Sequence, residues 1–116
     1  MQTTAIGVAL YKIKRNGSLH GKWTVASDKA HPPGTSDGTL GIEIATPLKR
    51  NRKSLAGKYE VIICRNDQEI FSGHLIIKEL KENAYKMSWM KGKTTMYTGY
   101  GVKRRRNLAA NYWAIC

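Results

Sequence analysis

The stretch LIIKELKENAYKMSWM (residues 75–90) decides the fold class, because it could form either one helix or two strands. The β-branched and aromatic side chains of Ile76, Tyr85 and Trp89 favour strands, since such residues fit a pleated, half-buried surface. The polar triplet KEN at residues 81–83 is typical of a turn. We therefore predict two strands joined by a tight turn.

The rest of the chain shows the same alternation of apolar and polar residues, which is typical of half-buried strands. Runs such as RNGS, RNDQ and KGK separate the alternating segments and predict turns. The pattern does not repeat with the period of about 3.6 residues that a long helix would need. The expected strands are 4–13, 19–26, 39–46, 56–65, 69–79, 84–90, 94–102 and 107–115.

Eight short strands with mostly tight connections predict one all-β domain over residues 1–116, an up-and-down antiparallel barrel. Closure removes the exposed edges that an open sheet of this length would have. It also requires residues 4–13 to pair antiparallel to residues 107–115. A barrel of this size is just wide enough to hold one small ligand. A β-sandwich is the alternative architecture.

Several motifs carry a resemblance to a known class of barrels. They are the runs LAGKYEV, IFSGHLIIKEL, AYKMSWMKGKTTMYTGYGV and NLAANYW, together with Gly7, Val8, Tyr11, Gly17, Leu19, Gly21, Trp23, Gly41 and Glu43. In this set the chain resembles small bacterial calycin-like domains, the class that includes lipocalins and avidin-like proteins. The resemblance implies an eight-stranded barrel and no established reaction. The half that begins at Gly7 comes first instead of last, so the order looks circularly permuted. A closed barrel tolerates such a cut, because its end strands are neighbours.

The composition is strongly basic, with 20 Lys and Arg residues against 8 Asp and Glu residues and a net charge of +12. Such a surplus attracts polyanions, anionic membranes or acidic small ligands. No apolar run approaches the roughly 18 residues of a membrane-spanning helix. The first residues lack the pattern of a secretory signal, and the 2 cysteines suggest no disulfide framework. A reduced, cytoplasmic setting is therefore expected.

The basic residues gather in particular loops. In an up-and-down barrel successive loops alternate between the two ends, so the connections after the first, third, fifth and seventh strands share one rim. These connections carry nearly all of the net charge, whereas the 28–38 loop belongs to the other rim. We expect a basic collar that binds an anion, although the same charges could serve solubility alone. The candidate ligand-binding cations are Lys14, Arg15, Arg50, Arg52, Lys53, Lys103, Arg104, Arg105 and Arg106.

Aromatic residues lie within the strands rather than in the collar loops. Residues that share one strand parity, and are expected to face the interior, are Tyr59, Val61, Ile63, Phe71, Gly73, Leu75, Ile77, Tyr85, Met87 and Trp89. We take Trp23, Tyr59, Phe71 and Trp89 as candidate contacts for an apolar ligand, although core packing is the more frequent role of such rings. The pattern does not decide which side Trp23, Trp113, Tyr97, Tyr112 or Glu43 faces.

The sequence gives little support for catalysis. His20, His31 and His74 lack metal-ligand spacing to another His, Cys or carboxylate. Ser72 lies outside any Gly-x-Ser-x-Gly elbow, and no paired carboxylate is evident. We therefore expect neither an enzyme nor a protein that carries a cofactor or metal.

Two functions agree with these observations. The first is a binding module for a small anionic or amphiphilic ligand, with the apolar part in the barrel and the acidic group on the collar. The second is an interaction protein whose basic rim docks on nucleic acid or on an acidic protein surface. The collar loops PLKRNRKSL and KRRRN hold no Phe, Trp or Tyr that could stack on bases, and only Tyr11 lies near a collar loop, which weakens the case for single-stranded nucleic acid. The oligomeric state stays open.

Overall fold

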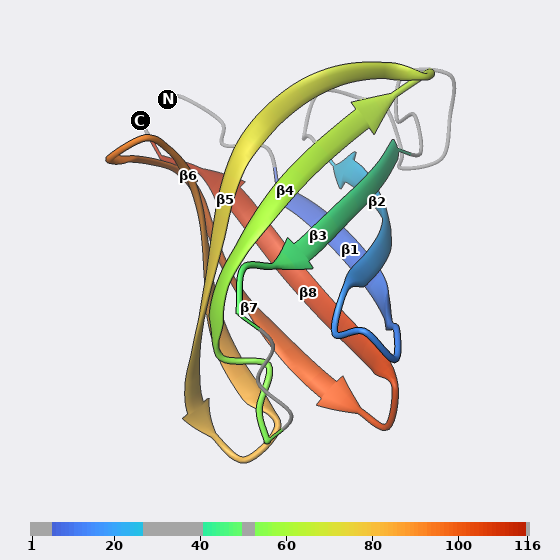
Figure 1. Ribbon diagram of the computed structural model, residues 1–116. Coiled ribbons are helices and arrows are strands. Elements are labelled where there is room, and N and C mark those ends of the chain that lie inside the picture. Colours follow the sequence, from blue (N-terminus) through green and yellow to red (C-terminus); the bar gives the residue numbers. More distant parts are fainter. Residues whose placement is uncertain (1–5, 27–40, 50–52, 116) are drawn as a thin grey trace.

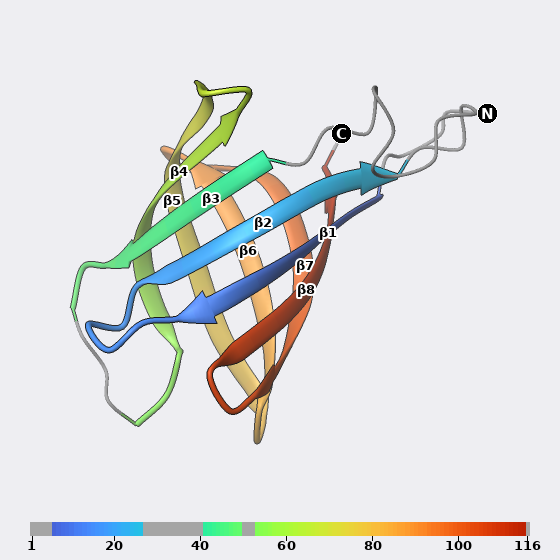
Figure 2. The ribbon, with the colours of Figure 1, turned by 90° about the vertical axis from the view of Figure 1, so that its right-hand side faces the viewer.

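The computed structural model describes residues 6–26, 41–49 and 53–115, and its eight strands form a closed antiparallel barrel. The strands follow one another around the barrel in chain order (Figures 1 and 2). They are β1 (Ile6–Ile13), β2 (Leu19–Ala26), β3 (Gly41–Pro47), β4 (Gly57–Arg65), β5 (Gln68–Lys81), β6 (Ala84–Lys91), β7 (Thr94–Arg104) and β8 (Asn107–Ala114). The predicted all-β class and up-and-down order are confirmed. Positions 4, 5, 39 and 40 of the predicted strands lie outside the described residues.

The first and last strands close the barrel. Their antiparallel pairing runs from Ile6 opposite Trp113 to Lys12 opposite Asn107, as the sequence predicted. The sandwich alternative is wrong, because a sandwich consists of two separate sheets and this sheet closes on itself. We call the β1–β8 pairing the seam.

The stretch at residues 75–90 forms the end of β5 and nearly all of β6, which pair from His74 opposite Met90 to Lys81 opposite Ala84. The helical alternative is therefore wrong. Asn83 takes a φ of 63° in the turn, a left-handed conformation that Asn tolerates well. The β7–β8 turn is equally tight, and there Arg105 takes a φ of 57°, which is unfavourable for an arginine.

The barrel interior follows the predicted parity. Tyr59 and Val61 on β4, and Tyr85, Met87 and Trp89 on β6, are all buried. The largest fully buried side chains are Trp89, Tyr11, Leu19, Leu75, Met87, Leu108 and Val61. These residues form one core with partly buried Ile63 and Phe71 at its edge.

The outer wall is also apolar over part of its surface. On β1, Ile6, Val8 and Leu10 are exposed, whereas Ala9 and Tyr11 between and beside them are buried. On β3 the aliphatic side chains of Ile42 and Ile44 face outward. Apolar residues therefore line both faces of these strands, so apolar character alone does not mark the interior.

Candidate functional site

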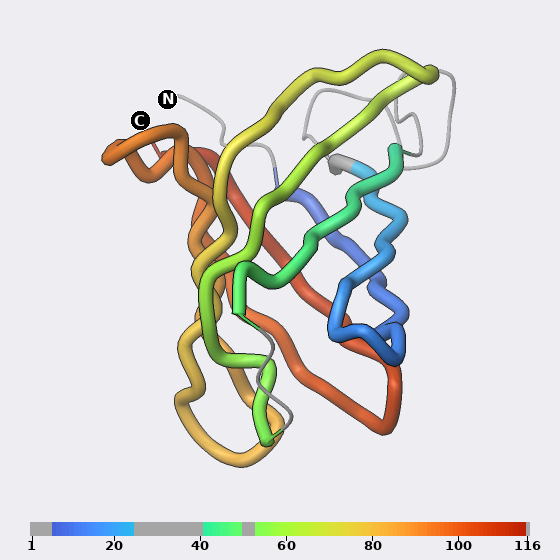
Figure 3. Tube along the Cα trace, viewed as in Figure 1, coloured from blue at the N-terminus to red at the C-terminus, as the bar shows by residue number. Residues whose placement is uncertain are grey.

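Basic side chains from three connections surround a cleft of about 520 Å³ at one end of the barrel, and a fourth connection contributes acidic ones. The β1–β2, β3–β4, β5–β6 and β7–β8 connections all lie at this end, the lower end of the trace in Figure 3. The cationic lining residues are Lys14, Arg15, Lys53, Lys103, Arg105 and Arg106. The acidic lining residues are Glu79 and Glu82, so among the residues that the structure describes cations outnumber acids threefold in what we call the collar cleft.

Hydrogen bonds tie these connections to one another. The Ile13 amide donates to the Arg106 carbonyl at 2.8 Å, which joins the β1 end to the β7–β8 turn. The Lys103 amide donates to the Asn83 carbonyl at 2.8 Å, and the Ser54 hydroxyl donates to Glu79 at 3.2 Å. The cations are consequently attached to a connected backbone rather than to independent loops.

The floor of the collar cleft is apolar. Leu55, Tyr59 and Tyr85 line it, and all are buried. The Tyr59 hydroxyl donates to the Leu55 carbonyl at 2.7 Å, which fixes the ring beneath the cations. Burial, with a smaller contribution from Tyr85, raises the pKa of Tyr59 to about 12, so this phenol stays neutral at physiological pH. The cleft thus combines a basic rim with a neutral, partly aromatic base.

The structure brings most of the predicted collar residues together but not all of them. Arg104 is exposed at the end of β7 and does not line the cleft. Arg50, Arg52 and the 28–38 loop lie outside the described residues. Of the predicted aromatic contacts, only Tyr59 lies at the collar end.

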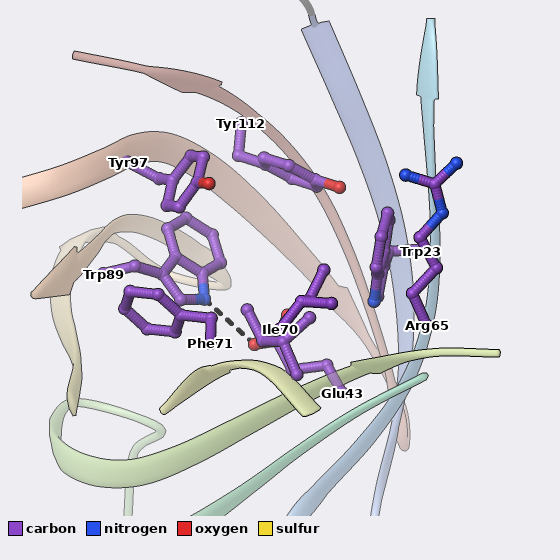
Figure 4. Close-up of a pocket in the computed structure, with 9 residues that line it drawn as sticks. Trp23, Glu43, Arg65, Ile70, Phe71, Trp89, Tyr97 and Tyr112 are labelled. Atoms are coloured by element: carbon purple, nitrogen blue, oxygen red, sulfur yellow. Dashed lines mark hydrogen bonds between the residues drawn. The ribbon is translucent and has the colours of Figure 1, made fainter. Parts of the chain in front are cut away.

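The other three aromatic candidates line a separate pocket of about 230 Å³ (Figure 4). We call it the aromatic pocket, and its lining residues are Trp23, Glu43, Ile63, Arg65, Ile70, Phe71, Trp89, Tyr97 and Tyr112. Buried residues separate it from the collar cleft. On β4, Val61 lies between Tyr59 of the cleft and Ile63 of the pocket, and on β6 Met87 has the same position.

Glycines make room for the rings of this pocket. A Cβ atom at Gly41 would collide with the Trp23 indole, and one at Gly7 would collide with the Tyr112 ring. The rings then contact one another, with Trp89 and Tyr112 at 5.6 Å and Tyr97 and Tyr112 at 6.2 Å between centroids. Tyr97 and Tyr112, whose sides were undecided, therefore face inward.

Glu43 is the one acid among the described residues that line the aromatic pocket, and it is only 2% exposed. Its carboxyl accepts a hydrogen bond from the Trp89 indole Nε1 at 2.9 Å (Figure 4). Burial raises the pKa of Glu43 to about 7, and the Trp89 hydrogen bond limits the rise. The sequence left Glu43's side open because Ile42 and Ile44 flank it, yet these two are the residues that face outward.

Two further buried polar groups lie close to Glu43 or to the pocket without a hydrogen-bond partner in the described part of the chain. One is the indole Nε1 of Trp23, and the other is the hydroxyl of Tyr11. Burial first, and the nearby Glu43 charge second, raise the pKa of Tyr11, although its hydroxyl falls short of a well-formed hydrogen bond to that carboxyl. A buried donor without an acceptor is costly, and such groups are rare in folded proteins.

Sequence reasoning missed several pocket residues. It did not include Arg65 and Ile70, which come from the β4–β5 hairpin that extends past the barrel wall in Figure 1. Small residues on the parity of Glu43 offered a usable signal, because Gly41 and Ala45 on either side of it are the ones that face inward.

Metal ligands do not cluster in the described residues, where no group of three or more His, Cys, Asp or Glu side chains could hold an ion. None of the described segments forms a helix long and apolar enough to cross a membrane. No family model, curated protein or solved structure matches the chain. The function must therefore be inferred from the geometry of the two ends of the barrel.

Proposed function

We propose that the protein is a non-enzymatic binding module whose collar cleft takes a small anionic or amphiphilic ligand. The observation that carries this proposal is the convergence of Lys14, Arg15, Lys53, Lys103, Arg105 and Arg106 on one cleft. An acidic group would bind among these cations, and the apolar part of the ligand would lie on Leu55, Tyr59 and Tyr85. This proposal differs from the arrangement expected from the sequence, in which the apolar part entered the barrel itself.

The conformation of Arg105 supports a role beyond solubility. A left-handed φ of 57° costs a non-glycine residue about 1–2 kcal/mol, and Asn or Gly would relieve it. Strained residues of this kind cluster at functional sites. A charge needed only for solubility would be served equally well at an unstrained position.

Docking on nucleic acid is less well supported. Single-stranded nucleic acid is held by exposed aromatic rings interleaved with cations. In the collar cleft the two aromatic rings, Tyr59 and Tyr85, lie at the floor and do not alternate with the cations, so they form no row of platforms on which successive bases could stack.

We also infer a calycin-like relationship with permuted strand order, as the motifs of the sequence imply. The adjacency of β1 and β8 supports it, because a barrel cut elsewhere and joined at this seam would keep the same strand neighbours.

The test compares three ten-carbon probes, namely decanoate, decanol and decyltrimethylammonium, with a uridine oligonucleotide as a fourth. We expect decanoate to bind best and its affinity to fall as salt rises. A hydrogen bond to a charged group contributes about 1.5–3 kcal/mol. The double variant Arg105→Asn with Arg106→Ser should therefore weaken decanoate binding at least about tenfold.

The matched control is Lys22→Ser combined with Lys86→Ser, which removes the same charge from exposed positions on the outer wall. It should change decanoate affinity less than about twofold. If both double variants lose the same decanoate affinity, decanoate responds to the overall charge of the protein and not to the collar cleft. Tighter binding of the oligonucleotide than of decanoate would favour nucleic-acid docking instead.

A further inference from the structure

The aromatic pocket has polar groups that packing alone does not require. Glu43 is buried with one well-formed hydrogen bond, from Trp89, and the Tyr11 hydroxyl lies nearby, whereas a carboxylate can accept about four. The Trp23 indole N–H is buried without an acceptor among the described residues. A filled core would place apolar side chains here, since unsatisfied buried polar groups are unfavourable. Glu43 and Trp23 both line the same hollow, so an acceptor and a donor belong to its wall.

Within residues 6–26, 41–49 and 53–115, no positively charged group neutralises Glu43. Arg65 lines the pocket, but in Figure 4 its guanidinium lies on the far side of the Trp23 ring from the Glu43 carboxyl. Lys91 lies over the Phe71 ring at 5.5 Å and donates to the Ser72 carbonyl at 2.9 Å. A cation from outside would complete the environment of the carboxyl.

The rings around the carboxyl suit such a cation. Trp23, Phe71, Trp89, Tyr97 and Tyr112 surround the hollow on several sides (Figure 4). Aromatic faces attract ammonium and guanidinium groups through their quadrupoles, and the attraction increases when the cation is desolvated. A volume of about 230 Å³ accommodates a small molecule rather than a peptide segment or lipid tail.

We propose that the aromatic pocket is a second binding site, for a small organic ammonium ion that carries a ring and an oxygen acceptor. The ammonium N–H donates to Glu43, the oxygen accepts from Trp23 Nε1, and the ring packs among the aromatic side chains. The site lies at the opposite end from the collar cleft and selects the opposite charge. It does not depend on the collar proposal.

A series of four related probes separates these contacts. 2-Amino-1-phenylethanol has the ammonium, the hydroxyl and the ring. 2-Phenylethylamine lacks the hydroxyl, and 1-phenyl-1,2-ethanediol replaces the ammonium with a hydroxyl. Mandelate has a carboxylate in place of the whole aminomethyl group. Calorimetric titration at pH 8, where Glu43 is mostly ionised, should rank the amino alcohol first. The diol should bind at least about tenfold more weakly, and mandelate should show no binding.

Two variants assign the contacts to residues. Glu43→Gln keeps the shape of the side chain and removes its charge, so it should abolish the preference for the amino alcohol over the diol. Trp23→Phe removes the indole N–H and should lower the affinity for the amino alcohol to that for 2-phenylethylamine, a loss of about two- to tenfold. Circular dichroism verifies that each variant is folded, and Trp23→Phe still tests the site if Glu43→Gln unfolds.

Several results would overturn the proposal. One is mandelate binding as tightly as the amino alcohol. Another is an unchanged ammonium preference in folded Glu43→Gln. Absence of binding by all four probes to the wild-type protein would also reject it, whatever decanoate does at the collar cleft.

Discussion

The two ends of the barrel treat charge in opposite ways. At the collar cleft, cations project from turns, where exposed side chains remain solvated and cost little. At the aromatic pocket, one acid projects from the middle of a strand into the interior, where burial raises its pKa to about 7. Charge placed on turns can be changed with little effect on folding, whereas charge placed inside a strand is coupled to the stability of the barrel. The comparison predicts that variants at the two ends separate binding from stability.

The largest expected effect is at the pocket end, with Trp89→Ala. Trp89 is the largest fully buried side chain, and its indole holds Glu43. Truncation should lower the free energy of unfolding by about 3–5 kcal/mol. Urea denaturation measures it, with Trp113→Ala as the control. Trp113 packs on the outer wall against Tyr100 at 6.0 Å and should cost less than half as much. Equal losses would mean that the pocket end carries no special share of the stability.

The second effect is a dependence of stability on pH. Glu43 has a pKa of about 7 when folded, compared with an ordinary value of 4.5, so the folded state holds this proton more tightly. The stability contribution is complete below about pH 4.5 and is lost as pH rises through about 7. At 1.36 kcal/mol per pKa unit the loss is about 3 kcal/mol. We measure the free energy of unfolding of wild type and of Glu43→Gln between pH 4 and pH 8. As pH rises, the value for wild type should fall by about this amount relative to the value for Glu43→Gln. Parallel curves would contradict it.

The smallest effect is at the collar, with Arg105→Asn. Asn tolerates the left-handed conformation that Arg105 adopts at φ 57°, so the variant should be more stable by about 0.5 kcal/mol. Because it also removes a cation from the cleft, decanoate affinity should fall. Thermal unfolding and titration of the same sample give both quantities. If the variant is less stable, or binds decanoate as well as wild type does, then the strained conformation of Arg105 does not serve binding.

The sequence predicted the strands well because turn residues separate them clearly. RNDQ forms a tight hairpin in which Asn66 and Asp67 both have positive φ, the conformation that such residues favour. Loop alternation then correctly brought Lys14, Lys53 and Arg106 to one end.

The sides of individual residues were harder to predict. Ile42 and Ile44 are as apolar as core residues, yet they lie on the outer wall, and Glu43 between them is buried. Alternation gives the two faces of a strand without saying which face is inside. The choice was made by small residues at Gly41 and Ala45, which leave space for the Trp23 ring and the core. Steric room, rather than hydrophobicity, determined which side chains of this strand face the pocket.

The seam has a consequence for how the protein folds. It joins the two strands that are farthest apart in the chain, so it is the slowest pairing to find, whereas the hairpins from β4 to β7 need only local contacts. The ring stays open until residues Asn107–Ala114 have been synthesised. Until then β1 pairs with β2 on one side only, and its free edge lies beside Ile6, Val8 and Leu10, side chains that also face outward after closure. The unfinished barrel is thus the species most prone to aggregate, and the surplus of positive charge keeps its copies apart.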